Sequence, residues 1–296
     1  MTTPILVDMN KETGISTITF NRPEKYNAID EAMAAAFHEA AQAIASDKGI
    51  RCVVLKGAGK AFMAGGDVAA FAADPDRADL VLQRILRHMH PALLILQQLP
   101  VPVIAAIHGP AAGAGLSMVL SADYAICSQS AEFILAYDRL ATVPDCGGSW
   151  YLRQKLGPRA AFALMLKGGK LNASQAREIG IVNDVVEDSS YQEQLSALIQ
   201  KIASGPTRAF GLFKQLLAAD LSLAAQLEAE KAAFMEATYT QDFRALPEQE
   251  TGSISRILKR DRVQREPLYS TSPCKTKQLP EREISCSNPT RTPITS

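Results

Sequence analysis

The chain has 296 residues, of which 47% are hydrophobic and 21% are charged, and its formal net charge at pH 7 is zero. This composition is typical of a globular protein with enough apolar side chains for a large core. A neutral balance argues against a protein whose main partner is nucleic acid, because binding phosphates requires a clustered positive excess. The composition favours a metabolic enzyme.

The first half of the sequence alternates strand and helix patterns. Residues 15–20 alternate apolar and polar side chains, which predicts a half-buried strand, and the apolar run at 50–56 predicts a strand buried on both faces. Asp30 is a good N-cap for an amphipathic helix at 31–46. The pattern continues with a helix at about 77–98, a strand at 101–107, a helix from about Gly115, and strands at 124–127 and 132–134.

After Pro144 the sequence is mostly helical. Asn172 is expected to cap a helix at 173–179, and a strand should follow at 181–186. The remaining predicted helices lie at 191–203, 206–219 and 223–239. This order indicates a mixed α/β core followed by a helical segment.

The last part of the chain has a different composition. From residue 256 to the end, the sequence has nine Lys or Arg and four Asp or Glu. It also has several Pro, Ser and Thr, and its apolar periodicity is weak. Such a segment is expected to be disordered. A basic tail could also bind nucleic acid, but a solvated extension is the simpler interpretation.

Cysteines and local hydropathy narrow the setting of the protein. The five cysteines are far apart and form no paired CxxC, so they predict neither a disulfide framework nor a metal site. The first twelve residues show no basic leader followed by an apolar run, so we expect no secretory signal and a cytoplasmic location. Residues 99–122 lack charges, but Pro100, Pro102 and Pro110 interrupt them, which argues against a membrane span.

Two stretches place small residues at a turn that should follow a strand: Lys60-Ala-Phe-Met-Ala-Gly-Gly-Asp67 and Ile107-His-Gly-Pro-Ala-Ala-Gly-Ala-Gly115. Such turns let backbone N–H groups approach a ligand oxygen, and a helix N-terminus favours developing negative charge. Two donors converging on one oxygen would form an oxyanion hole. The glycines also have a purely structural explanation, since they could simply turn the chain or allow close helix packing.

With Asn21-Arg-Pro-Glu-Lys-Tyr-Asn-Ala28 before them, these stretches resemble the motifs of the enoyl-CoA hydratase/isomerase (crotonase) family, from about residue 15 to residue 244. The resemblance implies an α/β fold, a crotonase-like spiral of ββα units with a C-terminal helical region, that assembles as a homotrimer or hexamer. The corresponding division is a crotonase core at 1–200, a helical oligomerisation region at 201–245, and an atypical tail at 246–296 that is expected to be disordered.

The resemblance also implies roles for individual residues. The N–H groups of Gly66 and Ala114 would face the thioester oxygen of the substrate. Coenzyme A would be present as part of that thioester, with no permanently bound cofactor. The residues expected along the coenzyme are Lys25, Ala28, Ala64, Gly65, Gly66, Asp67 and Val68, with Gly113 lining the acyl site. Lys25 could instead be an ordinary loop lysine, and Asp67 could cap the following helix.

Asp145 is the expected acid/base. It lies in Val143-Pro-Asp-Cys-Gly-Gly-Ser-Trp150, which is similar to the isomerase of phenylacetate breakdown that acts on an aromatic epoxyacyl-CoA and to some Δ3,Δ2-enoyl-CoA isomerases. Hydratases of the family position water with two glutamates, and the corresponding positions here hold Ser117 and Tyr137, which argues against water addition by that mechanism. Asp145 could alternatively cap the helix that contains Trp150.

We therefore expect an acyl-CoA isomerase of fatty acid or phenylacetate metabolism that moves a proton through a thioester enolate. The alternatives are an enoyl-CoA hydratase, a noncatalytic or RNA-associated relative, and an enzyme like the 4-chlorobenzoyl-CoA dehalogenases. In those dehalogenases a histidine near the position of His90 is a base and an aspartate at the position of Asp145 is a nucleophile, but Tyr137 replaces an expected tryptophan. The sequence after Arg244 departs from the family's usual C-terminus.

Overall fold

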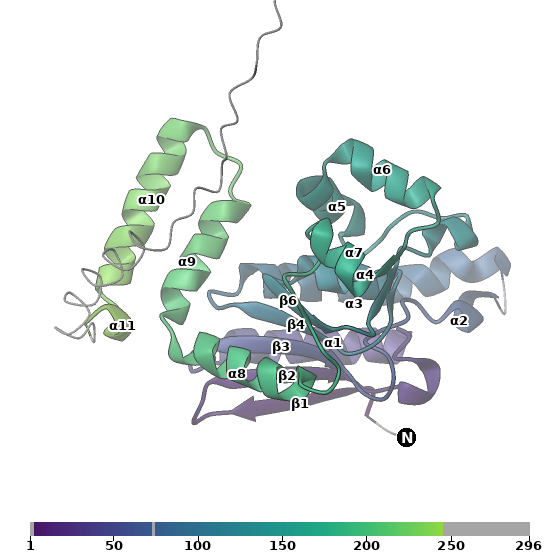
Figure 1. The fold of residues 1–296 in the computed structure, drawn as a ribbon, viewed down its shortest axis with the longest axis horizontal. Helices are drawn as coiled ribbons and strands as arrows, with labels where there is room; N and C mark the ends of the chain where they lie inside the picture. The colour runs from purple at the N-terminus through teal and green to yellow at the C-terminus, as the bar shows by residue number, and fades with distance from the viewer. Residues whose placement is uncertain (1–2, 73–74, 245–296) are drawn as a thin grey trace, which may run out of the picture. The chain divides into compact units, whose positions relative to one another are not determined.

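Six strands form the main sheet of the protein. In the computed structural model, which describes residues 3–72 and 75–244, their order is β1-β2-β3-β4-β6-β9 (Figure 1). β1 pairs with β2 antiparallel, and every other neighbour is parallel. The strands are β1 (Ile5–Asn10), β2 (Ile15–Phe20), β3 (Cys52–Gly57), β4 (Val103–Ile107), β6 (Tyr124–Ser128) and β9 (Asp184–Val186).

Helices cover both faces of this sheet. Val53 and Leu55 of β3 belong to the larger apolar cluster, which also contains the buried residues of α1 (Glu31–Ser46) and α3 (Ala78–Gln98). Val54, between them, points to the other face and packs in a second cluster with α8 (Tyr191–Ser204). Because successive side chains of a strand point to opposite faces, a continuous apolar run suits a strand covered on both sides.

A small second sheet carries the elements that build the candidate site. Its order is β5 (Ala111–Ala112), β7 (Glu132–Ile134) and β8 (Lys170–Asn172). α4 (Ala114–Ser121) begins two residues after β5 ends, and α5 (Gly148–Leu156) and then α6 (Pro158–Leu166) pack in sequence beside it. α7 (Ala173–Glu178) follows β8, and the short elements are α2 (Val68–Ala72) and the 3₁₀ helices Pro23–Lys25, Pro75–Arg77 and Tyr137–Leu140.

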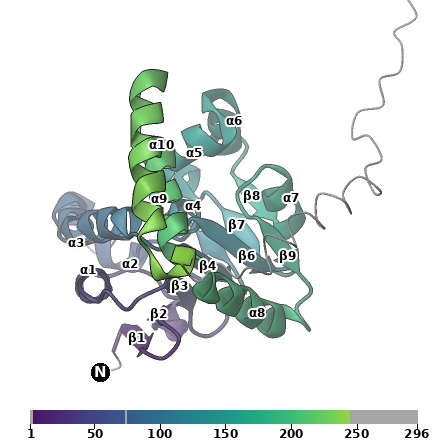
Figure 2. The ribbon, with the colours of Figure 1, turned by 90° about the vertical axis from the view of Figure 1, so that its left-hand side faces the viewer.

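The last described helices are α9 (Thr207–Ala218), α10 (Leu223–Thr238) and α11 (Gln241–Arg244). Figure 2 shows α9 and α10 side by side. Lys214 attaches α9 to the core, because its ammonium donates to the Asp123 carboxylate and to the Leu96 carbonyl, each at 2.8 Å. Within the residues that the structure describes, no helix is both long and apolar enough to cross a membrane.

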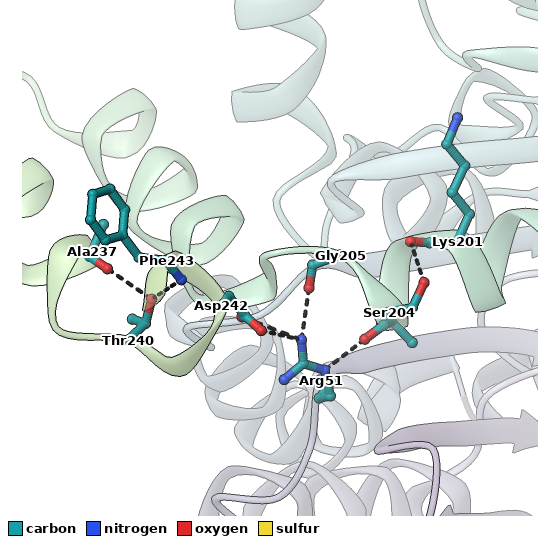
Figure 3. Close-up of polar contacts among 9 residues, drawn as sticks. Arg51, Lys201, Ser204, Gly205, Ala237, Thr240, Asp242 and Phe243 are labelled. Carbon is teal, nitrogen blue, oxygen red and sulfur yellow. Dashed lines mark hydrogen bonds and ion pairs between the residues drawn. The ribbon is translucent and has the colours of Figure 1, made fainter. Parts of the chain in front are cut away.

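Arg51 connects α8, α11 and the sheet (Figure 3). Its Nε donates to the Ala203 carbonyl oxygen at 2.6 Å, and Nη2 donates to the Gly205 carbonyl oxygen at 2.7 Å. The same Nη2 lies 3.1 Å from Oδ1 of Asp242 in α11. One guanidinium therefore binds the carbonyl end of α8 and the last described helix.

The mixed α/β core followed by helices is confirmed. Residues 31–46 form α1 as predicted, and the Asp30 side chain caps it by accepting from the Met33 N–H at 2.8 Å. Asn172 and Gln175 form a capping box at α7. The strand predicted at 181–186 is shorter, since Ile181 and Val182 are buried but pairing starts at Asp184. The expected tail at 246–296 lies outside the described residues, and the predicted boundary at residue 201, which falls within α8, stays a prediction.

Candidate active site

The two small-residue stretches lie against each other. The Phe62 and Met63 N–H groups donate to the Pro110 carbonyl oxygen at 3.0 and 3.2 Å, and the Ala112 N–H donates to the Met63 carbonyl oxygen at 2.8 Å. These bonds hold the loop after β3 beside β5. The turn that contains Gly65 and Gly66 is thereby brought to the start of α4.

Glycine is required at this contact. Gly65 has φ +93°, and a methyl group added there would lie 2.9 Å from the Ala112 carbonyl oxygen and 3.3 Å from the Ala114 nitrogen. A methyl group on Gly115 would lie 2.2 Å from the Met63 carbonyl oxygen. These glycines therefore allow close packing, the structural explanation given for them above, and they place two backbone segments at close range.

The Gly66 and Ala114 amides have no hydrogen-bond acceptor among the described residues. The loop around Gly66 is fixed by Ile29, whose N–H donates to the Gly65 carbonyl oxygen at 2.7 Å and whose carbonyl oxygen accepts from the Asp67 N–H at 2.9 Å. The Ala114 N–H belongs to the first residue of α4, where the helix cannot pair it internally. Two N–H groups on adjacent segments are thus available to an oxygen of a ligand.

The segment before α1 is tied to the same loop. Arg22 binds the Ala28 carbonyl oxygen, and its Nη2 lies 3.1 Å from Oδ2 of Asp67. The Ala64 N–H donates to the Tyr26 carbonyl oxygen at 2.9 Å. Asp67 therefore directs its carboxylate to Arg22, and no side-chain cap of α2 by Asp67 occurs among the described contacts.

The residues expected along coenzyme A lie in these two connected segments. Ala28 and Gly65 are buried, Gly66 and Asp67 are half-buried, and three others face solvent: Lys25, Ala64 and Val68. Gly113 has φ +53° and lies against Gly65, since its added methyl group would be 3.8 Å from the Gly65 Cα. Contact of any of them with a coenzyme stays a prediction.

Asp145 lies in the loop before α5, and its carboxylate contacts Tyr137, which in turn contacts Ser117. The Tyr137 hydroxyl donates to Oδ1 of Asp145, and the Ser117 Oγ lies 3.5 Å from the Tyr137 Oη. Tyr137 is 5% exposed and Ser117 is 1% exposed. The three positions singled out from the sequence are therefore in contact, and Asp145 is the one carboxylic acid among them.

Asp145 is not a helix cap. α5 starts after Gly147, which has φ +78° and no side-chain cap, and only the main-chain oxygen of Asp145 accepts a bond there, from the Gly148 N–H at 2.8 Å. Gly148 also makes room for the neighbouring helix, since a methyl group there would lie 2.4 Å from the Ser117 Oγ. The capping alternative is excluded by the direction of the carboxylate.

The surroundings of Asp145 keep neighbouring groups protonated. Burial raises the pKa of the Tyr137 hydroxyl, and the negative charge of Asp145 and the bond to it raise that pKa further. Burial likewise raises the pKa of the Cys146 thiol, with the charge of Asp145 as the next cause. A protonated phenol can donate to a carboxylate at any pH at which the protein is used.

An apolar cavity of about 460 Å³ lies between α3 and the start of α5. It is lined by His90, Leu93, Leu94, Gln97, Cys146, Gly147, Trp150 and Tyr151. His90, the base implied by the dehalogenase alternative, therefore shares a cavity with the two residues that follow Asp145. Such a cavity next to the candidate acid could hold part of an acyl group.

Sequence reasoning found the motif residues but not all of the contacts. The Arg22 guanidinium joins Asp67 to the Ala28 carbonyl oxygen, and the sequence signal for this contact is only the place of Arg22 in the first motif. Over residues 3–72 and 75–244, no group of three or more His, Cys, Asp or Glu could hold a metal ion.

The fold and the paired loops define a crotonase-type protein. The chain belongs to the enoyl-CoA hydratase/isomerase family, whose sequence profile matches residues 10–257. Over 224 residues it is 38% identical to the 1,2-epoxyphenylacetyl-CoA isomerase of Escherichia coli K12, covering 74% of this chain and 85% of that protein. It is 37% identical over 235 residues to a Rhodobacter capsulatus protein named "Probable enoyl-CoA hydratase", covering 78% and 89%.

Solved structures agree with this assignment. The structure of an enoyl-CoA hydratase from Mycobacterium smegmatis superimposes with a TM-score of 0.74 at 29% identity, covering 87% of this chain and 96% of that one. The predicted crotonase fold is thereby confirmed. These matches establish the family. Relatives named as isomerase and as hydratase match at nearly equal identity, so the identities do not distinguish between the two reactions.

Proposed function

We propose that the protein isomerises acyl-CoA thioesters, with Asp145 as the acid/base. The observation that carries the proposal is the chain of contacts from Asp145 through Tyr137 to Ser117, because this group of three side chains contains one carboxylic acid. A single carboxylate can remove a proton from one carbon and return it to another. The two-glutamate mechanism positions water with two carboxylic acids. At the corresponding positions this chain has the hydroxyl groups of Ser117 and Tyr137.

The reaction would proceed through an enolate. Asp145 takes the proton from the α-carbon of a 3-enoyl thioester, and the electron pair of that C–H bond moves toward the carbonyl oxygen. The Gly66 and Ala114 N–H groups donate to this oxygen as its negative charge develops. The same carboxyl then returns the proton at the γ-carbon, which gives the 2-enoyl thioester and restores the carboxylate.

Two substrate classes fit this chemistry. One is a linear 3-enoyl-CoA, and the other is an aromatic epoxyacyl-CoA, the class named for the Escherichia coli relative. The cavity beside Cys146 and Gly147 is lined mainly by apolar and aromatic side chains, which suits either an alkyl chain or a ring. We propose that coenzyme A runs along the exposed side of the loop at residues 64–68, next to Lys25.

The test compares three thioesters. The purified full-length protein is incubated with 3-hexenoyl-CoA, 2-hexenoyl-CoA and an aromatic epoxyacyl-CoA, and the products are separated by liquid chromatography with mass detection. We expect isomerisation of the first or third and no hydration of the second. Hydration of 2-hexenoyl-CoA at a comparable rate would favour the hydratase alternative, and halide release from 4-chlorobenzoyl-CoA would favour the dehalogenase alternative.

Asp145→Asn in the same assay tests the role of the carboxylate. We expect turnover to fall by at least about a thousandfold, because the amide cannot accept the α-proton, while acyl-CoA binding measured by calorimetry is kept. Asp138→Asn is the matched control, since Asp138 is an exposed carboxylate in the adjacent 3₁₀ helix. Turnover retained in Asp145→Asn would contradict the proposal.

We further propose that the protein assembles as a homotrimer or a hexamer. α9 and α10 carry several large apolar side chains that are at least half exposed in the single chain: Phe213, Leu217, Leu223, Leu227, Phe234 and Met235. Exposed apolar surface of this extent on two adjacent helices is typical of a protein–protein interface. A partner of the same chain would cover it.

A further inference from the structure

One oxygen of the Asp145 carboxylate is occupied by Tyr137. The Tyr137 hydroxyl donates to Oδ1, and its ring is buried against the core with 5% of its surface exposed. The hydroxyl has a second neighbour in Ser117, whose Oγ lies 3.5 Å away. A buried ring and two polar neighbours restrict where the hydroxyl can lie, so the carboxylate is held in one orientation.

The hydrogen bond has a fixed direction. An ionised carboxylate can only accept, and burial together with the charge of Asp145 raises the pKa of Tyr137, so the phenol keeps its proton. Bonds from a neutral donor to a charged acceptor are among the stronger hydrogen bonds of proteins. Oδ1 is therefore used for attachment, and Oδ2 is the oxygen left to exchange a proton.

The attachment leads back to the helix that starts at Ala114. Ser117 follows Ala114 by three residues in α4, so both lie on about one turn of the same helix. Gly148, three residues after Asp145 in the chain, packs on the Ser117 Oγ so closely that an added methyl group would lie 2.4 Å from it. The carboxylate of Asp145 and the amide of Ala114 are therefore both positioned by the same helix, α4.

We infer that Tyr137 is a positioning residue: it fixes Asp145 through Oδ1, and with Ser117 it sets the carboxylate relative to the Ala114 amide. The inference rests on the proposed function, in which Asp145 moves the proton. Because the proton leaves the α-carbon and returns to the γ-carbon, the carboxylate has to reach both carbons from one position. Misplacement by a fraction of an ångström would therefore lower the rate without removing the acid.

Tyr137→Phe tests this role, because it removes only the hydroxyl from a buried ring. With the better of the two isomerisation substrates, we expect kcat to fall about tenfold to a hundredfold, the loss typical of a hydrogen bond to a charged group, and KM to change little.

Tyr124→Phe is the matched control. The Tyr124 hydroxyl donates to Oδ2 of Asp184 at 2.6 Å, so this variant also removes one hydroxyl–carboxylate bond, between β6 and β9. Its kcat and KM should equal those of the unaltered protein. Ser117→Ala should lower kcat in the same direction as Tyr137→Phe but by less, since Ser117 acts on the carboxylate only through Tyr137.

The outcomes are distinguishable. If Asp145→Asn is inactive while Tyr137→Phe keeps the kcat of the unaltered protein, the positioning role is wrong and the proposed function stands. If Tyr137→Phe and Tyr124→Phe both lower the melting temperature and neither changes kcat, the role is also wrong. If Asp145→Asn retains turnover, the proposed function fails and the positioning role fails with it.

Discussion

Gly65 lies directly against the main chain of Ala114. A methyl group on Gly65 would stand 3.3 Å from the Ala114 nitrogen, and the Gly65 backbone has φ +93°, a conformation that residues with a side chain rarely adopt. The loop after β3 and the first residue of α4 therefore approach each other at a distance that only glycine permits. In the proposed mechanism, this approach sets the spacing of the two amide donors.

We predict that Gly65→Ala pushes the loop away from α4 and displaces the Gly66 amide. Because loss of one oxyanion donor typically lowers the rate about a hundredfold or more, kcat/KM should fall by that factor. It should also destabilise the fold by about 1–3 kcal/mol through backbone strain. Gly157→Ala is the control, since Gly157 has φ +76° but nothing within 4 Å of an added methyl group. Equal losses of activity in both variants, measured with urea unfolding alongside, would contradict the role assigned to the contact.

Arg51 is expected to stabilise the C-terminal helices. Arg51→Ala removes bonds to the Ala203 and Gly205 carbonyl oxygens and the ion pair with Asp242, so the free energy of unfolding should fall by about 1–3 kcal/mol. Hydrogen exchange should speed up at residues 203–205 and 241–244. Arg84→Ala breaks only an exposed pair with Glu31 and should change stability by less than about 1 kcal/mol. Similar losses in both variants would count against the Arg51 anchor.

The three cysteines of the described core should resist alkylation. Burial raises the pKa of Cys52 and of Cys127 to about 12, and it also raises the pKa of Cys146. At pH 8 the thiolate form of Cys52 or Cys127 is about one part in ten thousand, so iodoacetamide should label these sites only after denaturation. Peptide mapping by mass spectrometry checks this. Rapid labelling of Cys52 in the native protein would refute it.

The same pKa shifts predict a sign for the pH dependence of stability. An unfolded cysteine loses its proton near pH 8.5, whereas the folded chain keeps the Cys52 and Cys127 protons up to about pH 12. Between these values the unfolded state binds fewer protons, so the free energy of unfolding should decrease as pH rises. Replacing both residues with Ala should flatten the curve measured by urea unfolding from pH 8 to pH 10.

A charge on the exposed face of α9 should separate the subunits of the proposed oligomer. Phe213 and Leu217 are 60% and 70% exposed in the single chain, one turn apart on α9. We expect Phe213→Glu to shift the mass measured by light scattering from that of a trimer or hexamer to that of a monomer. Leu6→Glu, at a position of β1 that is 46% exposed, should leave the mass unchanged. An unaltered protein that is already monomeric would rule out the proposed assembly.

Capping residues and apolar periodicity in the sequence predicted the elements that have such signals. α1 has a capping aspartate and six buried apolar positions, so its bounds follow from sequence alone. β1 was missed because Ile5 is its one buried residue, and an edge strand with so little buried surface shows no alternation. α6 has one polar side chain, Arg159, among its nine residues, so its sequence shows no separate apolar and polar faces.

The site was predictable only in part. The residues of the three motifs could be named by resemblance, but the bond from Tyr137 to Asp145 joins a 3₁₀ helix to the loop before α5. The place of Ser117 beside them depends on the packing of α4 against α5. Contacts between side chains of separate elements are set by the tertiary packing, which no periodicity in the sequence records.

α4 carries Ala114 and Ser117 within one turn, whereas the apolar cavity is walled by α3 and α5. Side chains such as Leu94 and Gln97 can therefore be exchanged without disturbing the turn from which the amide and the carboxylate take their alignment. In the proposed mechanism, a library confined to the cavity-lining residues of α3 would vary the acyl group that is accepted and leave the residues that move the proton unaltered.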